Sequence, residues 1–277
     1  KEVPPVYETI KLNSTTSRSF LVEGMRFLRG DMRMMAKVAP SWAGLALTFY
    51  AGRGAAEHVV DFIAAVGHRA KQYKFLRGEA FTLSGEFLER GTTAWTDLFL
   101  AEANSEPLRR ATSLVNERGA TMESRGIIFA GPPGTGKTLA CRAMLTEAKD
   151  ATFVWVSSRD FARAGCFGGI ELAFDLAQEN APAILLMEDI DAWLDTYSID
   201  LMKTELDGLK QRAGIVTVLT TNYPESLPKS LIDRPGRFHD VLQLGLPDAA
   251  VRQRMLDAWA PDATLAVRAQ LAQDTGG

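Results

Sequence analysis

"GPPGTGKT", residues 131–138, decides the fold because it matches the pattern G-x-x-x-x-G-K-[S/T]. The glycines let the backbone bend until its N–H groups point at phosphate oxygens. The lysine reaches the β- and γ-phosphates, the final hydroxyl faces Mg²⁺, and the following helix N-terminus adds positive potential. We therefore expect ATP to be bound by this loop and the residue after it: Gly131, Pro132, Pro133, Gly134, Thr135, Gly136, Lys137, Thr138 and Leu139.

Apolar runs and helical patterns alternate on both sides of this loop. The runs are typical of strands at 126–130, 152–157, 183–188, 215–221 and 241–246. Helical patterns occupy 137–148, 169–180, 199–211 and 248–260. Continuous apolar strands that alternate with helices predict an α/β fold, here a P-loop NTPase with a parallel five-stranded sheet and helices on both faces.

The run "ILLMEDID", residues 184–191, ends in carboxylates at the edge of the predicted core. Buried-edge carboxylates need a cation or a hydrogen-bond partner, and a bound nucleotide brings Mg²⁺. We expect Glu188 to support Mg²⁺ together with Thr138, and Asp189 to polarise the attacking water. Successive strand residues point to opposite sides, which favours this assignment. The reverse assignment, with a shifted strand end, stays open.

Two further motifs follow in the order that a nucleotide site requires. Asn222 comes directly after the strand 215–221, where it can orient water or the γ-phosphate, although such an Asn is also a common turn residue. Arg234 and Arg237 lie in the Pro-Gly loop "LIDRPGRFH", residues 231–239. They are either a solvated basic turn or arginine fingers that contact a neighbouring subunit's γ-phosphate.

The succession GPPGTGKT, apolar run with two acids, TTN and RPGRF resembles the AAA family of AAA+ ATPases over roughly residues 93–275. "WTDLFLAE", "NAPAILLMEDID" and "LPDAAVRQRMLDAW" continue the likeness. Glu-Asp in place of the usual Asp-Glu, and "LMKTELDGL", are similar to the branch that contains the mitochondrial Rieske-protein translocase and its bacterial relatives.

The resemblance implies an ATPase that assembles with itself into a ring, usually a hexamer, and uses ATP hydrolysis to remodel or translocate a protein partner. It implies that Asp97 and Leu98 lie against adenine and that Arg234 and Arg237 act on the neighbour's nucleotide. Many relatives carry a pore-loop aromatic, for which Phe167 is the nearest candidate, displaced in register. A nucleic-acid motor or loader and a ring that uses nucleotide only for assembly are the alternatives.

The first 92 residues differ from the rest in charge. They hold 13 Lys and Arg against 9 Asp and Glu, a net of +4, whereas the remainder holds 18 against 25, a net of −7. We therefore expect three parts: an N-terminal α+β accessory domain at 1–92, the large ATPase subdomain at 93–246, and a truncated helical lid at 247–277. Residues 55–70 have the pattern of an amphipathic helix. The basic, Met-containing segment 26–37 predicts a solvated helix face, with a binding patch as the alternative.

Composition excludes several other classes of protein. Two cysteines cannot form a disulfide framework, and Cys141 has the place of a small buried filler. The apolar segment 42–52 is too short to span a bilayer and predicts a core helix or a buried strand. Three scattered histidines and the lack of H-E-x-x-H argue against a zinc protease site. With a net charge of −3, we expect no nucleic-acid partner. Because two cysteines suggest a reducing compartment, we expect a cytoplasmic location.

Overall fold

The computed structural model describes residues 5–11, 15–29, 33–41, 44–52, 54–74, 76–164, 166–192, 195–208, 212–232, 238 and 240–274. The chain divides into two compact units, Lys1–Leu76 and Arg77–Gly277. This division lies earlier than the one predicted near residue 92. The segment 77–92 contributes a strand and several hydrogen bonds to the second unit. The boundary predicted at residue 92 was based on net charge, which does not indicate such contacts.

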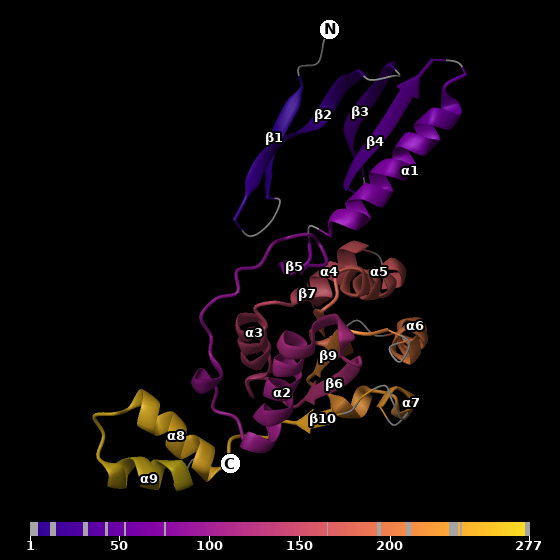
Figure 1. Ribbon diagram of the computed structural model, residues 1–277. Helices are drawn as coiled ribbons and strands as arrows, with labels where there is room; N and C mark the ends of the chain where they lie inside the picture. Colours follow the sequence, from indigo (N-terminus) through magenta and orange to yellow (C-terminus); the bar gives the residue numbers. More distant parts are fainter. Residues whose placement is uncertain are drawn as a thin grey trace. The chain divides into compact units, whose positions relative to one another are not determined.

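The first unit is an antiparallel sheet with one helix (Figure 1). Its strands lie in chain order: β1 (Val6–Lys11), β2 (Ser17–Arg29), β3 (Arg33–Ser41) and β4 (Gly44–Ala51). Helix α1 (Ala56–Tyr73) follows, and its Phe62 ring meets Phe49 of β4 edge-on with 5.7 Å between centroids. The predicted α+β accessory fold is confirmed, and so is the helix expected at 55–70.

Where the structure describes the basic, Met-containing segment 26–37, at 26–29 and 33–37, the segment is extended strand and not helix. It forms the end of β2 and the start of β3, where Phe27 pairs with Met35 and Leu28 with Met34. Side chains alternate across the sheet, so Met34 and Ala36 are buried while Met25 and Phe27 on the other face are exposed. The helix prediction was therefore wrong. The segment 42–52 contains a strand, Gly44–Ala51, as one of its two predicted forms required. Leu47 and Tyr50 are exposed, so the burial predicted for that strand was wrong.

The second unit is built on a parallel sheet that, among the described residues, has six strands in the order β10-β6-β9-β8-β7-β5. Five of them are the predicted strands: β6 (Arg125–Ala130), β7 (Thr152–Val156), β8 (Ala183–Met187), β9 (Ile215–Thr221) and β10 (Asp240–Gln243). The sixth, β5 (Ala80–Thr82), pairs in parallel with β7 at the edge. The P-loop NTPase fold is thus confirmed, with one strand more than expected.

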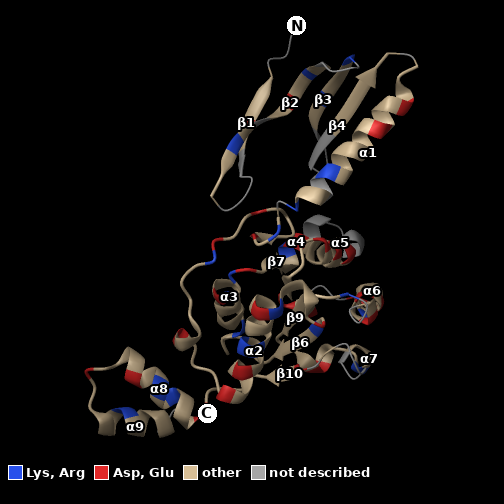
Figure 2. Ribbon diagram, viewed as in Figure 1, with Lys and Arg blue, Asp and Glu red and all other residues tan. Residues whose placement is uncertain are grey.

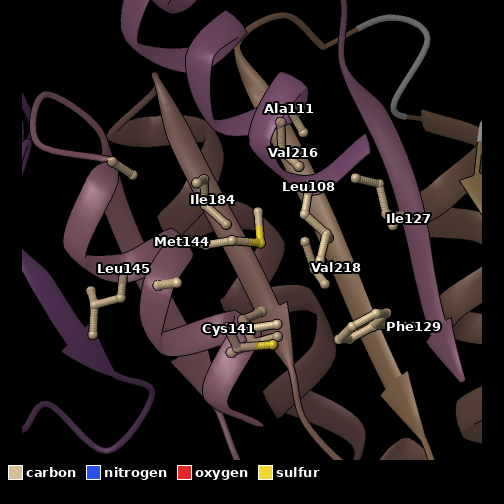
Figure 3. Packing of buried hydrophobic residues seen from close by; sticks show 14 of the residues in the cluster. Leu108, Ala111, Ile127, Phe129, Cys141, Met144, Leu145, Ile184, Val216 and Val218 are labelled. Carbon is tan, nitrogen blue, oxygen red and sulfur yellow. The ribbon is translucent and has the colours of Figure 1, made fainter. Parts of the chain in front are cut away.

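Helices cover both faces of this sheet (Figure 1). The apolar core on one face joins α2 (Glu102–Arg118) and α3 (Lys137–Glu147) to inward-facing residues of β6, β8 and β9 (Figure 3). The opposite face carries α5 (Cys166–Glu179), which contacts β7 and β8. Along β8, Ile184 and Leu186 point to the face covered by α2 and α3, and Leu185 and Met187 point to the opposite face. All four side chains are buried. Burial on both faces is why β8 is a continuous apolar run in the sequence.

Shorter elements complete the unit between these helices and strands. The helical ones are α4 (Ser158–Ala164), α6 (Thr196–Gly208), α7 (Lys229–Ile232) and the 3₁₀ turns η1 (Trp95–Asp97), η2 (Gly119–Thr121), η3 (Ile190–Ala192) and η5 (Pro224–Ser226). Among the described residues, no helix combines the length and apolar character needed to cross a membrane.

Arg90 ties the segment 77–92 to the end of the phosphate-loop helix. Its guanidinium donates to the carbonyls of Leu145 (3.0 Å), Ala148, Gly78 (2.8 Å) and Ala151 (2.6 Å). Burial lowers the pKa of Arg90 below its ordinary value, although neighbouring carboxylates oppose the shift. One cation therefore satisfies carbonyls around the C-terminus of α3, where such groups lack helical partners.

Two helices follow the sheet, and the first of them lies where the sequence predicts a helix. Asp248 is the N-cap of helix α8 (Ala249–Trp259), and its carboxylate accepts a hydrogen bond of 2.8 Å from Val251 N. Helix α9 (Leu265–Asp274) packs against it. Arg254 of α8 donates to Leu100 O at 2.6 Å, so this pair is joined to the segment that follows η1.

Candidate nucleotide site

The phosphate-loop residues join β6 to α3 in a conformation that only glycine adopts easily. Gly131, Gly134 and Gly136 have positive φ angles of 153°, 82° and 94°. A Cβ atom on Gly131 would lie 2.2 Å from the backbone oxygen of Leu244, so no side chain fits there. Pro132, Pro133 and Gly134 are exposed at the tip of the loop. The loop therefore leaves its backbone open to a ligand, as the sequence predicts.

Lys137, the first residue of α3, is buried and points back into the loop. Its Nζ donates to Gly131 O at 2.6 Å and Pro132 O at 2.9 Å. Burial lowers the pKa of Lys137 from its ordinary value, while the carboxylates of Asp189, Asp191 and Glu188 act in the opposite direction. An ammonium has three donors, so this cation can also meet phosphate oxygens.

Glu188 follows directly after β8 and faces the phosphate loop. Its Oε1 accepts a hydrogen bond of 2.5 Å from Thr138 Oγ1, on the first turn of α3. Its Oε2 accepts one of 3.1 Å from the indole Nε1 of Trp155 on β7. A hydroxyl and a carboxylate side by side are the hard oxygen donors that Mg²⁺ takes, usually with retained waters. The pair predicted to support the metal is thus brought together.

Asp189 takes a different direction from Glu188, although not for the predicted reason. Strand β8 ends at Met187, and Asp189 has a left-handed backbone with φ 50°. Its backbone N–H donates to Thr220 Oγ1 at 2.9 Å, and its Oδ1 accepts 3.0 Å from Asn222 Nδ2. A left-handed turn held by β9 therefore separates the two carboxylates, and strand alternation does not.

Asn222 lies beside the acidic strand end, as expected, and a second carboxylate fixes its backbone. Its N–H donates to Asp191 Oδ1 at 2.9 Å. Sequence reasoning gave no role to Asp191, Thr220 or Trp155. Asp191 could have been noticed from its place two residues after Asp189, whereas nothing in the sequence singles out the other two.

The residues predicted to contact adenine lie on η1 and just after it. Asp97 uses its carboxylate locally, since Oδ2 accepts a hydrogen bond of 2.8 Å from Ala94 N. Leu98 and Leu100 are buried. A Cβ atom on Gly136 would lie 3.7 Å from a methyl carbon of Leu100, so this segment borders the phosphate loop. Phe99 also meets Trp259 of α8 edge-on, with 5.3 Å between centroids.

Some of the predicted residues cannot be located in the site. Arg234 and Arg237 lie outside the described residues. Phe167 falls in the first turn of α5. Cys141 is fully buried on α3, and burial raises the pKa of its thiol well above the ordinary value, which agrees with a role as buried filler. Within the described part of the chain, no group of three or more His, Cys, Asp or Glu residues could hold a metal ion by themselves.

A strand, glycine loop and helix that face a carboxylate pair define a P-loop nucleoside triphosphatase. Residues 127–246 match the family described as "ATPase family associated with various cellular activities (AAA)". Residues 127–246 therefore form a domain of the AAA ATPase family, whose members use ATP with Mg²⁺. The resemblance seen in the sequence is confirmed at the level of the family, while the Glu-Asp branch stays a prediction.

Relatives with curated descriptions are similar to this chain over part of its length. The chain is 36% identical over 156 residues to the ATP-dependent zinc metalloprotease FtsH 2 of Petrotoga mobilis, covering 50% of this chain and 24% of that protein. It is 34% identical over 223 residues to FtsH 3 of Sphaerobacter thermophilus, covering 73% and 45%. It is 36% identical over 155 residues to the mitochondrial inner membrane i-AAA protease supercomplex subunit YME1 of Saccharomyces cerevisiae, covering 51% and 20%. The chain thus spans less than half the length of each.

Proposed function

We propose that this protein is an ATP-driven motor that assembles with itself into a ring and remodels or translocates a protein partner. The main support for ATP hydrolysis is the way in which two carboxylates adjacent in the chain are separated. Glu188 accepts a hydrogen bond from Thr138, whereas Asp189 accepts one from Asn222. One carboxylate beside the metal position and one beside a water-orienting amide is the arrangement that phosphoryl transfer to water needs.

Each residue then has its own task. Lys137 and the loop amides bind the phosphates, and Thr138 with Glu188 holds Mg²⁺, which neutralises phosphate charge when bound. Asp189 accepts a proton from the attacking water, and Asn222 keeps that carboxylate and the water in line. Leu98 and the segment after η1 border the base. Glu188, Asp189 and Asn222 follow the ends of β8 and β9, and Lys137 and Thr138 begin the helix that follows the β6 loop. The carboxyl ends of parallel strands are where ligands of such sheets bind.

The ring and the protein partner rest on family likeness. YME1 is named as a subunit of a protease supercomplex, and the FtsH relatives are named as ATP-dependent proteases. The proposal concerns the ATP-driven handling of a protein, since no H-E-x-x-H occurs within the 277 residues of the sequence. In a hexamer, Arg234 and Arg237 would contact the neighbour's γ-phosphate. Acidic and basic residues are mixed along α1 and α8 (Figure 2), whereas a nucleic-acid motor favours a single-sign surface. The cytoplasmic location stays a prediction.

A substrate trap tests the proposal. Asp189→Asn should leave Mg·ATP bound and the ring assembled while hydrolysis stops, so that a protein held by the ring stays with it during purification. Wild-type protein and Lys137→Ala are the controls, because the first releases its partner and the second does not bind ATP. An Asp189→Asn ring that binds ATP and retains no protein above these controls would reject the proposed protein-directed function. Salt-sensitive retention of DNA would favour the nucleic-acid alternative.

A further inference from the structure

The two oxygens of Glu188 face different partners. Oε1 faces Thr138 and the phosphate loop, whereas Oε2 accepts a hydrogen bond from the indole N–H of Trp155. Trp155 lies on β7, next to β8 in the sheet, where it is in register with Leu186. The carboxylate is therefore held from the sheet side while its other oxygen points to the proposed metal position.

The indole donor itself is fixed. The Trp155 ring packs against Phe153 with 6.0 Å between centroids, and it lies against the apolar core cluster. The carbonyl of Trp155 accepts a hydrogen bond of 3.1 Å from Leu83 N, and β7 is paired on both sides, with β5 and β8. A tryptophan held in this way loses little further freedom when its N–H meets a carboxylate.

We propose that Trp155 is a positioning residue for the metal site: its indole N–H holds Glu188 so that Oε1 stays beside Thr138. The inference rests on the proposed function, in which Glu188 supports Mg²⁺. Glutamate has one methylene and one torsion more than aspartate, so its carboxylate needs an anchor to stay at the metal. Hydrogen-bond partners of metal ligands commonly supply such orientation.

A simpler arrangement would give the same hydrogen bond, since a half-buried indole N–H usually finds an acceptor. In that case Glu188 serves only as the hydrogen-bond acceptor of the Trp155 indole, and the contact does not affect Mg²⁺ binding. The two cases differ in the Mg²⁺ dependence of nucleotide binding, because only an anchored Glu188 makes the metal site depend on the indole.

Trp155→Phe keeps an aromatic ring in the core and removes the N–H. The full chain is titrated with Mg²⁺ in the presence of a fluorescent ATP analogue, and binding is followed without hydrolysis. We expect the Mg²⁺ concentration for half-maximal binding to rise about tenfold, as for loss of other such partners. Binding of the analogue in excess EDTA and the thermal unfolding midpoint, which do not depend on the metal, should change little.

A second pair of variants links the effect to the glutamate. Glu188→Asp keeps the charge but shortens the side chain, so that it no longer reaches the indole. In that background Trp155→Phe should leave the Mg²⁺ midpoint unchanged, because the two residues act through one contact. The inference is wrong if Trp155→Phe titrates like the wild type, or if it shifts the midpoint equally with either acid at 188.

The indole N–H resonance gives a measurement on the unaltered chain. With ¹⁵N-labelled tryptophan, the Trp155 signal should move when Mg²⁺ is added to the nucleotide-bound protein. If Trp155→Phe does not fold, the signal is identified by replacing the other four of the five tryptophans. A signal that does not respond to Mg²⁺ would contradict the inference. Failure of the wild type to bind Mg·ATP, or equal binding by Lys137→Ala, would instead overturn the proposed function and this inference with it.

Discussion

The side-chain amide of Asn222 donates a hydrogen bond of 3.0 Å to Asp189 Oδ1, across 33 residues of sequence. The contact joins the ends of β9 and β8, which are neighbours in the sheet. It draws Asp189 away from Glu188, although the two carboxylates are adjacent in the chain. Two acids at one strand end can therefore take separate tasks, one at the metal and one at the water.

Lys137→Ala should lower ATP affinity about a hundredfold, because a charge-assisted phosphate contact is lost. Isothermal titration with ATP and Mg²⁺ measures the affinity, and circular dichroism checks that the fold is kept. Lys149→Ala removes an exposed lysine just beyond the same helix and should bind ATP normally. Equal affinities of the two variants would show that the loop is not the phosphate site.

Gly131→Ala should destabilise the second unit and abolish nucleotide binding. The added Cβ would lie 2.2 Å from Leu244 O, so the backbone after β10 must move, at a cost of about 3 kcal/mol or more. Gly134→Ala is the matched control. It also has a positive φ, yet no atom lies within 4 Å of its Cβ, so only about 1 kcal/mol of backbone strain is expected. Urea unfolding should therefore rank Gly131→Ala well below Gly134→Ala, and the opposite ranking would refute the close approach.

Arg90→Gln should lower the free energy of unfolding by about 3 kcal/mol, because carbonyls near the end of α3 lose a shared charged donor. Arg77→Gln changes an exposed arginine of the same segment and should have an effect within about 0.5 kcal/mol. Urea denaturation of both variants gives the difference. If they unfold alike, the segment 77–92 is not held to the second unit by Arg90.

The sequence predicted the second unit well because its strands are buried on both faces and therefore form unbroken apolar runs. The place of Ala80–Thr82 in this sheet was not predicted, since it depends on pairing with β7, which is distant in the sequence. The helix predicted at 26–37 was wrong for a related reason. Met and Arg are compatible with both a helical and a strand pattern, and here pairing between β2 and β3 favours the strand.

The candidate site shows the same limit. The loop and the acid pair are local patterns, so the sequence alone indicated them. Trp155 and Thr220 reach the acids from neighbouring strands, and no spacing in the chain predicts such contacts. The left-handed backbone at Asp189 could not be predicted either, because the sequence does not show that the strand ends at Met187.

If Arg234 and Arg237 act on a neighbouring subunit, ATP turnover should rise steeply with protein concentration. Arg237→Ala and Lys137→Ala should each be inactive alone, yet their mixture should recover part of the turnover. At a mixed interface, an intact nucleotide site on one subunit meets an intact arginine from the other. Turnover by a strictly monomeric sample that does not change with concentration would rule out the assignment.

The most direct test of the account is a Mg²⁺ titration of ATP binding and turnover in Glu188→Gln and Asp189→Asn. Asp189→Asn should bind Mg·ATP normally and lose about 10²–10⁴-fold in turnover, because the general base is removed. Glu188→Gln should need more Mg²⁺ for half-maximal activity and recover when more is supplied. Asp200→Asn, which alters an exposed carboxylate on α6, should behave like the wild type. If Glu188→Gln instead binds Mg·ATP normally without hydrolysing it, while extra Mg²⁺ rescues Asp189→Asn, the roles of the two carboxylates are reversed and the account is contradicted.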